Sequence, residues 1–201
     1  MMEWTAFEDQ ARTEGYTCIC GIDEAGRGPL AGPVYAAAVV LRPGQVIEGV
    51  NDSKKLSEKK REALFDTICS QCAAYGIGSA TEKEIDEINI LNATYLAMQR
   101  AVAALPVQPD CALVDGNRAP DLPLEVRTII KGDAQSASIA AASILAKVSR
   151  DRYMLQMAEN YPQYAFDKHK GYGTKLHYER LEQYGISPIH RLSFLKKWMN
   201  R

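Results

Sequence analysis

An acidic pair followed by a glycine-rich turn has the clearest chemical potential in this sequence. Residues 23–28 are Asp-Glu-Ala-Gly-Arg-Gly and follow an apolar stretch at 18–22. Two carboxylates at the end of a buried strand repel each other, and a divalent metal ion is the simplest partner for them. Gly26 and Gly28 let the backbone approach a ligand closely, and Arg27 offers paired donors to a phosphate. Metal and phosphate binding side by side indicate phosphoryl chemistry.

Two further acids follow apolar runs in the same manner. Asp115 ends the run 111–114, and Asp133 follows the next run along the chain. A single acid of this kind is typical of a solvated loop, but carboxylates on neighbouring strand ends converge at one edge of an α/β sheet, where ligand sites lie. With Asp23 and Glu24 they would form an oxygen-only site suited to magnesium or manganese.

The strand geometry separates the two acids of the pair. If 18–24 is extended, Asp23 and Glu24 point to opposite faces and cannot both reach one metal ion without a bend. We therefore expect Asp23 to be the bridging ligand. Glu24 would act less directly, through water, through its backbone carbonyl or at a second metal position.

The acidic pair belongs to a series of motifs in a fixed order. They are GIDEAGRGPLAGPV at 21–34, NDSKKL at 51–56, VDGN at 114–117, KGD at 131–133, AASILAKV at 141–148, HKGYGT at 169–174 and HRLSF at 190–194. Over roughly residues 19–194 the chain resembles ribonuclease HII, the type 2 ribonuclease H, in its bacterial form. The resemblance implies that the catalytic acids and metal ligands are Asp23, Glu24, Asp115 and Asp133.

The resemblance also implies an α/β fold and a reaction. The fold would be the ribonuclease H-like mixed sheet flanked by helices, as a single catalytic domain over 1–201 with a helical extension packed on it at about 174–201. The enzyme would use two Mn²⁺ or Mg²⁺ ions roughly 4 Å apart. It would cleave on the 5′ side of a ribonucleotide, in RNA/DNA hybrids or in DNA duplexes with embedded ribonucleotides, and leave 3′-hydroxyl and 5′-phosphate ends. Such an activity serves ribonucleotide removal in DNA replication and repair.

Recognition of a ribonucleotide requires contact with its 2′-hydroxyl. Backbone groups of Gly26, Arg27 and Gly28 are suited to this contact because glycine removes side-chain obstruction. Tyr172 could stack on the sugar beside the junction and form a hydrogen bond through its phenol. The alternative is that Tyr172 only packs a turn between two glycines.

Other residues are candidates for contact with the substrate backbone. Asn51, Ser53 and Lys54 place amide, hydroxyl and ammonium donors on one turn, which is typical of a phosphate-binding loop or of a turn that precedes a helix. Ser143 and Lys147 are four residues apart and share one face of a helix. His169 could contact phosphate or form a structural hydrogen bond.

Composition places the protein among ordinary cytoplasmic globular proteins. Its 201 residues are 46% hydrophobic and 24% charged, with a formal charge of −1, which excludes binding of nucleic acid by bulk positive charge. The start of the chain has neither a secretory signal nor a membrane anchor, so no membrane partner is expected, and we expect a monomer. The five cysteines fit a reducing compartment. A C-x-x-C at 69–72 invites a zinc or redox interpretation, but its place on an apolar helix face favours buried thiols.

Hydrophobic periodicity and capping residues predict the elements that hold these residues. We expect strands over 18–24, 33–41, 73–80, 111–115 and 126–130. We expect helices over 3–14, 58–72, 89–104, 136–160, 174–184 and 190–200, with caps at Ser57 and at Thr81, the latter before a short helix that precedes 89–104.

Two other classes of protein share part of this pattern. An integrase or transposase uses similar acids on a related fold, but it usually carries separate DNA-binding domains, for which we expect no room here. A catalytically inactive hybrid-binding module would keep the basic loop and lose acids, whereas all four are present.

Overall fold

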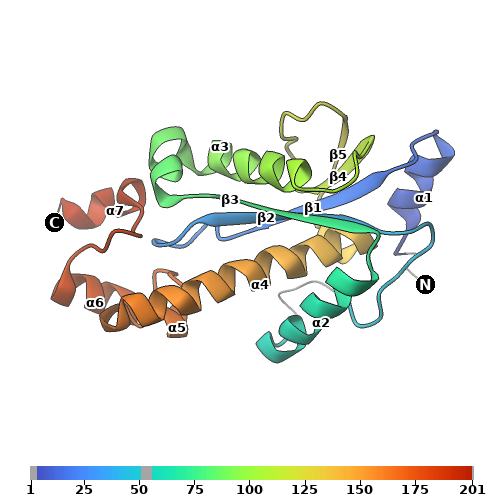
Figure 1. The fold of residues 1–201 in the computed structure, drawn as a ribbon. Helices are drawn as coiled ribbons and strands as arrows, with labels where there is room; N and C mark the ends of the chain where they lie inside the picture. Colours follow the sequence, from blue (N-terminus) through green and yellow to red (C-terminus); the bar gives the residue numbers. More distant parts are fainter. Residues whose placement is uncertain (1–3, 51–55, 201) are drawn as a thin grey trace.

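A five-stranded mixed sheet with helices on both faces forms the body of the molecule (Figure 1). The computed structural model describes residues 4–50 and 56–200. The strands are β1 (Ile19–Ala25), β2 (Val34–Val40), β3 (Ala74–Ala80), β4 (Cys111–Asp115) and β5 (Glu125–Ile129), in the order β3-β2-β1-β4-β5. The first three strands pair antiparallel, and β4 and β5 run parallel to β1. The predicted fold class is confirmed.

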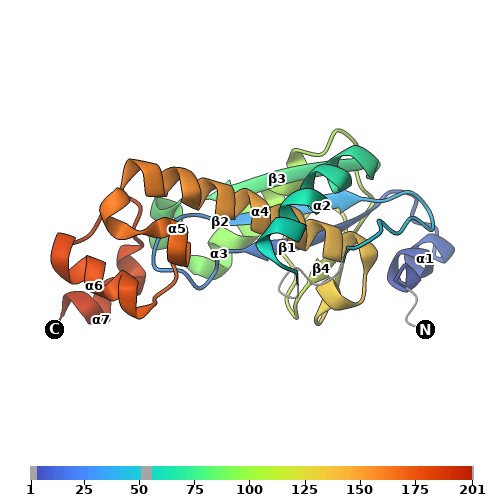
Figure 2. The same ribbon diagram turned by 90° about the horizontal axis from the view of Figure 1, so that it is seen from below.

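The helices form two layers around this sheet. They are α1 (Ala6–Thr13), α2 (Glu58–Gln71), α3 (Glu82–Ala103), α4 (Ala137–Asn160), α5 (Phe166–His169), α6 (Lys175–Tyr184) and α7 (Leu192–Met199), with short 3-10 turns η2 (Gly132–Ala134) and η3 (Pro162–Tyr164). In Figures 1 and 2, α3 covers one face of the sheet and α4 the other, while α6 and α7 lie at the end of the molecule remote from α1.

Local capping signals set where the helices begin. The Ser57 side chain accepts a hydrogen bond from the Lys60 amide at 3.4 Å, and Thr81 forms a reciprocal capping box with Glu84. Both predicted caps are confirmed, because each hydroxyl satisfies an amide that has no partner inside the helix. The predicted break before the second helix lies at Asn89, which has φ 67° and whose side chain accepts from the Leu91 and Asn92 amides.

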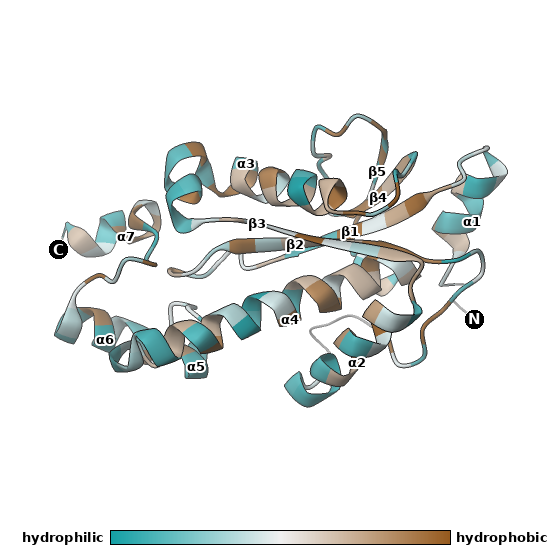
Figure 3. Ribbon diagram, viewed as in Figure 1, coloured by the Kyte–Doolittle hydropathy of each residue, from teal (hydrophilic) through white to brown (hydrophobic). Residues whose placement is uncertain are grey.

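Alternation along the strands divides the core into two layers. In β1, Cys20 and Ile22 pack toward α3, whereas residues of opposite parity face α4. Helix α4 crosses β1 at Gly21, where a Cβ would overlap the backbone of Ser138 and Ile139. Figure 3 shows the strands pale to brown and much of the outer surface of the helices teal, as expected for a sheet covered on both faces.

The cysteines behave as core residues. All five lie in the described ranges, and none of them forms a disulfide. Burial raises the pKa of the thiols of Cys20, Cys69, Cys72 and Cys111, which keeps these thiols protonated and unreactive. Across the same described ranges, no helix combines the length and the apolar character needed to cross a membrane.

Candidate active site

The acids of the sequence motifs gather at one edge of the sheet. In the parallel pair β1–β4, Ile22 lies opposite Val114. The next residues of the two strands are Asp23 and Asp115, so these carboxylates end neighbouring strands. Asp133 lies on η2, the turn that follows β5. The parallel part of the sheet therefore places Asp23 and Asp115 on adjacent strand ends, with Asp133 on the turn that follows the next strand.

Asp23 is a buried carboxylate with few groups to neutralise it. Its exposed fraction is 4%. Its Oδ1 accepts a hydrogen bond from the Glu24 amide at 2.7 Å, and the Ser143 side chain donates to it from α4. Burial, together with the negative charges of Glu24 and Asp115, raises the pKa of Asp23 well above its ordinary value, while the hydrogen bonds oppose this shift. A cation beside Asp23 would favour the charged carboxylate and lower its pKa.

Glu24 faces the other side of β1. It lines a cavity of about 200 Å³ together with Leu91, Thr94 and Tyr95 of α3, whereas Asp23 contacts Ser143 of α4. The two acids thus contact helices on opposite faces of the sheet, as strand alternation predicts, while both also border the cavity at the end of β1. Glu24 also accepts a hydrogen bond from Nη1 of Arg27 at 3.2 Å, so an arginine of the glycine-rich turn partly compensates its charge.

The end of β4 is tied to the turn that carries Asp133. Oδ1 of Asp115 accepts a hydrogen bond from the Gly132 amide at 2.6 Å, and the side chain of Asp133 is buried. Within residues 4–50 and 56–200, no three acidic, histidine or cysteine side chains form a group that could hold a metal ion unaided. Further ligands would have to come from water and substrate, which is the usual situation for Mg²⁺.

A second cavity joins three of the predicted acids, Asp23, Glu24 and Asp115, to the glycine-rich turn, whereas Asp133 is not among the residues that line it. It has a volume of about 250 Å³ and is lined by Asp23, Glu24, Ala25, Gly26, Arg27, Gly28, Asp115, Ser143, Lys147 and Tyr172. Gly26 has φ 96°, a conformation that favours glycine. A Cβ built on Gly28 would lie 3.8 Å from Cε1 of Tyr172, so the ring lies beside the turn. The Tyr172 side chain is 43% exposed and open to a ligand.

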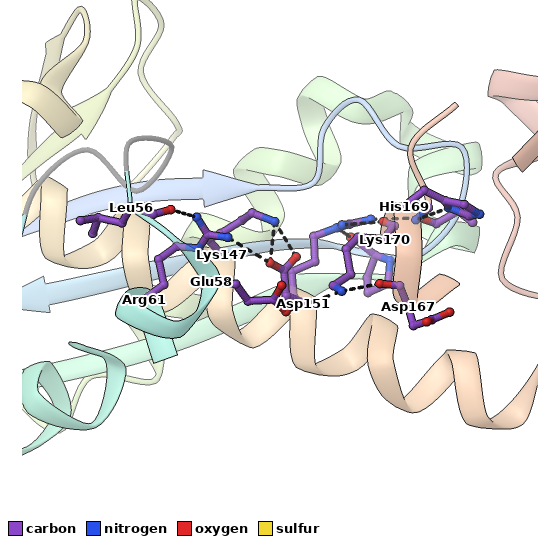
Figure 4. Close-up of polar contacts among 12 residues, drawn as sticks. Leu56, Glu58, Arg61, Lys147, Asp151, Asp167, His169 and Lys170 are labelled. Atoms are coloured by element: carbon purple, nitrogen blue, oxygen red, sulfur yellow. Dashed lines mark hydrogen bonds and ion pairs between the residues drawn. The ribbon is translucent and has the colours of Figure 1, made fainter. Parts of the chain in front are cut away.

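Lys147 lies in this cavity as part of an ion-pair network (Figure 4). Its Nζ donates to both carboxylate oxygens of Asp151 at 2.6 Å, and Nη2 of Arg61 lies 4.0 Å from the same carboxylate. Burial lowers the pKa of Lys147, and Asp151 opposes that shift. Lys147 and Ser143 come from one face of α4, as the spacing predicts.

The remaining predicted contacts divide into two groups. His169 is buried, its Nδ1 accepts from the Gly171 amide at 3.1 Å, and its Nε2 lies 2.9 Å from the Tyr164 carbonyl oxygen. These contacts favour the structural role for His169 over phosphate contact. The predicted phosphate loop, Asn51, Ser53 and Lys54, lies outside the described residues.

Sequence reasoning missed four buried polar residues around the glycine-rich turn and the Tyr172 loop. They are Arg150, His177, His190 and Arg191. Arg150 donates three hydrogen bonds to backbone carbonyls, those of Pro33, Lys170 and Ala31, at 3.0–3.1 Å. His190 and Arg191 open the HRLSF motif, so the signal was visible, but a local motif does not show which distant carbonyls a side chain contacts.

Comparison with known proteins identifies the family of this chain. The family model for ribonuclease HII matches residues 20–197. The ribonuclease HII of Caldicellulosiruptor bescii is 59% identical over 189 residues, which cover 94% of this chain and 92% of that protein. The ribonuclease HII of Clostridioides difficile is 58% identical over 190 residues, or 94% of this chain and 74% of that protein.

Solved structures give the same result at lower identity. The ribonuclease H2 of Pyrococcus horikoshii OT3 superposes with a TM-score of 0.73 and 30% identity, over 88% of this chain and 93% of that one. The ribonuclease HII in a PCNA complex from Archaeoglobus fulgidus gives a TM-score of 0.68 and 28% identity, over 88% and 94%. The chain therefore belongs to the ribonuclease HII family and is an endoribonuclease that acts on RNA–DNA hybrids.

Proposed function

We propose that this enzyme hydrolyses the phosphodiester on the 5′ side of a ribonucleotide, in RNA/DNA hybrids and in DNA duplexes with embedded ribonucleotides, with divalent metal ions. The products would carry 3′-hydroxyl and 5′-phosphate ends. One observation supports this most strongly: the buried Asp23 shares a single cavity with Asp115 and with the glycine-rich turn beside Tyr172. Groups suited to phosphodiester hydrolysis and groups suited to sugar recognition therefore face the same substrate.

The acids fit divalent ions by chemistry and by electrostatics. Their donors are all carboxylate oxygens, which suit Mg²⁺ or Mn²⁺. Burial and neighbouring acids raise the pKa of Asp23, and a bound divalent cation would offset both effects by favouring the charged carboxylate. Asp23 and Asp115 would hold the ions, with Glu24 and Asp133 as further ligands, and water and substrate would supply the remaining oxygens. When bound, such ions supply an activated water and stabilise the leaving oxygen.

The residues of the cavity wall would orient the substrate. Ser143 holds the Asp23 carboxylate in place through its hydrogen bond. Lys147 would contact a backbone phosphate, and its hydrogen bonds to Asp151 keep its ammonium group in position for this contact. Asn51, Ser53 and Lys54 remain proposed phosphate contacts on the basis of sequence. Their donors complement a strand whose own charge is negative.

Amides of the turn 26–28 would recognise the sugar. Gly26 and Gly28 leave the backbone accessible, and amide donors at this turn would contact the 2′-hydroxyl. Tyr172, partly exposed beside Gly28, would stack on the neighbouring sugar or base. A deoxyribose offers no hydroxyl at this position, so the same contacts would distinguish RNA from DNA.

Cleavage of a DNA duplex with one embedded ribonucleotide tests the proposal. We expect a single cut on the 5′ side of the ribonucleotide in Mg²⁺ or Mn²⁺ and no cut after the metal is chelated. An identical duplex with a deoxynucleotide at the same position is the control. Cleavage that is independent of metal, or equal for both duplexes, would contradict the proposal. Binding without cleavage would indicate a hybrid-binding module.

A further inference from the structure

Arg191 is a charged residue in the core that the chemistry of the acids does not require. Its exposed fraction is 0%, and among the described residues its guanidinium forms no ion pair, although the negative charges of Glu82 and Asp86 act on it from a greater distance. Burial and the nearby Arg150 lower the pKa of Arg191 to about 9. Burying a cation that has no ion pair is unfavourable in free energy unless its N–H donors form hydrogen bonds. The arrangement therefore calls for a specific role.

The guanidinium of Arg191 donates its hydrogen bonds to the glycine-rich turn and to the end of the same loop. Its Nη2 donates to the Gly26 carbonyl at 2.6 Å and its Nη1 to the Arg27 carbonyl at 3.0 Å. Its Nε donates to the Gly32 carbonyl at 2.8 Å, which closes the far side of the same loop. Three donors of one planar group thus fix three carbonyls of a single loop.

Peptide planarity carries this constraint to the amides that face the substrate. A trans peptide places the carbonyl of one residue and the amide of the next on opposite sides of a rigid plane. When Arg191 draws the Gly26 and Arg27 carbonyls inward, the amides of Arg27 and Gly28 point outward. These are two of the donors that the proposed function assigns to the 2′-hydroxyl.

His190, the preceding residue, acts on the Tyr172 loop through a chain of hydrogen bonds. The Ser187 amide donates to Nδ1 of His190 at 2.9 Å, so the proton of His190 is on Nε2. Nε2 of His190 lies 2.9 Å from Nε2 of His177 and donates to it. Nδ1 of His177 then carries a proton and donates to the Tyr172 carbonyl at 2.9 Å. Each bond fixes the tautomer of the next ring.

Backbone bonds join the two systems. Arg191 donates its amide to the Leu30 carbonyl, and the Leu30 amide donates to the Gly171 carbonyl, both at 2.8 Å. Ala31 and His190 form an isolated β-bridge. The segment around His190 and Arg191 is therefore linked to the glycine-rich loop and to the Tyr172 loop at once.

We propose that His190 and Arg191 are positioning residues for ribonucleotide recognition. Arg191 orients the amides of the turn 26–28, and His190, through His177, holds the loop of Tyr172 beside that turn. This inference rests on the proposed function, in which these groups contact the sugar. The segment between α6 and α7 thereby sets the selectivity of a site to which it contributes no substrate contact.

The test measures selectivity rather than activity. Dissociation constants are determined in the cleavage-deficient Asp23→Asn background, for two DNA duplexes that differ only by one 2′-hydroxyl. Arg191→Lys keeps the charge but lacks the planar fork of donors that reaches the carbonyls of Gly26, Arg27 and Gly32, and His190→Asn breaks the relay. We expect the affinity ratio of the two duplexes to fall by at least about tenfold in Arg191→Lys and by several-fold in His190→Asn. The first change removes the bonds that orient the amides of the turn 26–28, and the second removes those that hold the Tyr172 loop.

Two controls separate positioning from general stability. Arg152→Lys alters an exposed arginine of α4 that pairs with Glu62 and should leave the ratio unchanged. His177→Asn combined with His190→Asn should lower the ratio no further than either single change, because residues of one relay act as a unit. This second comparison stands even if Arg191→Lys fails to fold.

The outcomes distinguish the inference from its premise. If the parent binds both duplexes equally, the proposed sugar contact is wrong and the positioning role falls with it. If the parent discriminates and the Arg191 and His190 variants discriminate equally well, only the positioning role is overturned. A parallel loss of affinity for both duplexes, with an unchanged ratio, also overturns it, because that is the result of a merely structural role.

Discussion

The two sides of the cavity are built in different ways. On the acid side, Asp23 and Asp115 stand at the ends of paired strands, and the sheet itself sets their separation. On the recognition side, the glycine-rich turn and Tyr172 lie on loops, held by buried side chains such as Arg191. Regular structure thus places the proposed catalytic acids, whereas irregular structure with a buried polar scaffold places the proposed sugar contacts. Substitutions on the two sides should consequently impair different properties, namely the cleavage reaction on the acid side and the recognition of the ribonucleotide on the other.

The largest effect is expected on the acid side. Asp23→Asn should reduce cleavage of a single-ribonucleotide duplex to below about a thousandth of the parent rate, a barrier increase of about 4 kcal/mol. Binding of the duplex should persist because the phosphate contacts remain. The variant should also melt at or above the parent temperature, since burial and neighbouring acids already disfavour the charge of Asp23. Cleavage assays, binding titrations and thermal unfolding measure the three quantities.

A surface carboxylate provides the matched control for this change. Asp66→Asn alters an exposed residue of α2 and should leave both rate and melting temperature near the parent values. Near-normal turnover by Asp23→Asn in Mg²⁺ would remove Asp23 from the chemistry. A large loss of stability in the same variant would show that the carboxylate serves the fold instead.

Glu24→Gln should be milder than Asp23→Asn, by at least about tenfold in rate. Glu24 faces α3 and already has Arg27 as a partner at 3.2 Å, whereas Asp23 is enclosed beside α4. An uncharged amide at position 24 can still accept from Arg27. Parallel measurement of both variants with the same duplex and metal decides the point. Equal losses would mean that the opposite orientation of the two side chains has no catalytic consequence.

The acid side could be predicted from sequence because its signals are local. Each acid follows an apolar run, and strand alternation gives the orientation of Asp23 relative to Glu24. The strand and helix bounds were also close to those observed, since caps such as Thr81 act on amides within one turn. The short helix α5 was missed because four residues hold no periodicity, and η2 and η3 are shorter still.

The recognition side could not be predicted in the same way. The turn residues and Tyr172 were visible, but the contacts that hold them join residues more than 150 positions apart, as between Arg191 and the carbonyls of Gly26 and Arg27. A buried arginine has no periodic signature, and an isolated histidine fits phosphate contact and internal hydrogen bonding equally well. Only the fold shows that both ring nitrogens of His169 are occupied.

Substitution of Tyr172 should have an intermediate effect on the recognition side. Tyr172→Ala removes a stacking platform that contributes on the order of 1 to 3 kcal/mol, so we expect cleavage of the single-ribonucleotide duplex to slow at least about tenfold. Tyr172→Phe keeps the ring and should lie between this variant and the parent. Both should melt like the parent because the side chain is partly exposed. Comparable cleavage by the parent and the alanine variant would return Tyr172 to a packing role.

The smallest effect is a dependence of stability on pH that arises from the histidine relay. Burial lowers the pKa of His177 and of His190 to about 4, and their mutual repulsion adds to this for His190. In the unfolded chain a histidine has a pKa of about 6.5. As the pH is lowered, the unfolded state therefore binds protons before the folded state does. The contribution of the two histidines to stability is fully present above about pH 6.5 and is lost as the pH drops toward 4.

Removal of one histidine should flatten this dependence. At pH 5 a shift from about 6.5 to about 4 costs about 2 kcal/mol of unfolding free energy for one ring. His190→Asn should therefore lose about 2 kcal/mol less than the parent between pH 7 and pH 5, whatever its stability at pH 7. Asp23 titrates with the opposite sign, but it is present in both proteins and cancels in the difference. Urea unfolding at the two pH values measures this difference, and identical losses in the parent and the variant would mean that His190 has the same pKa in the folded protein as in the unfolded chain.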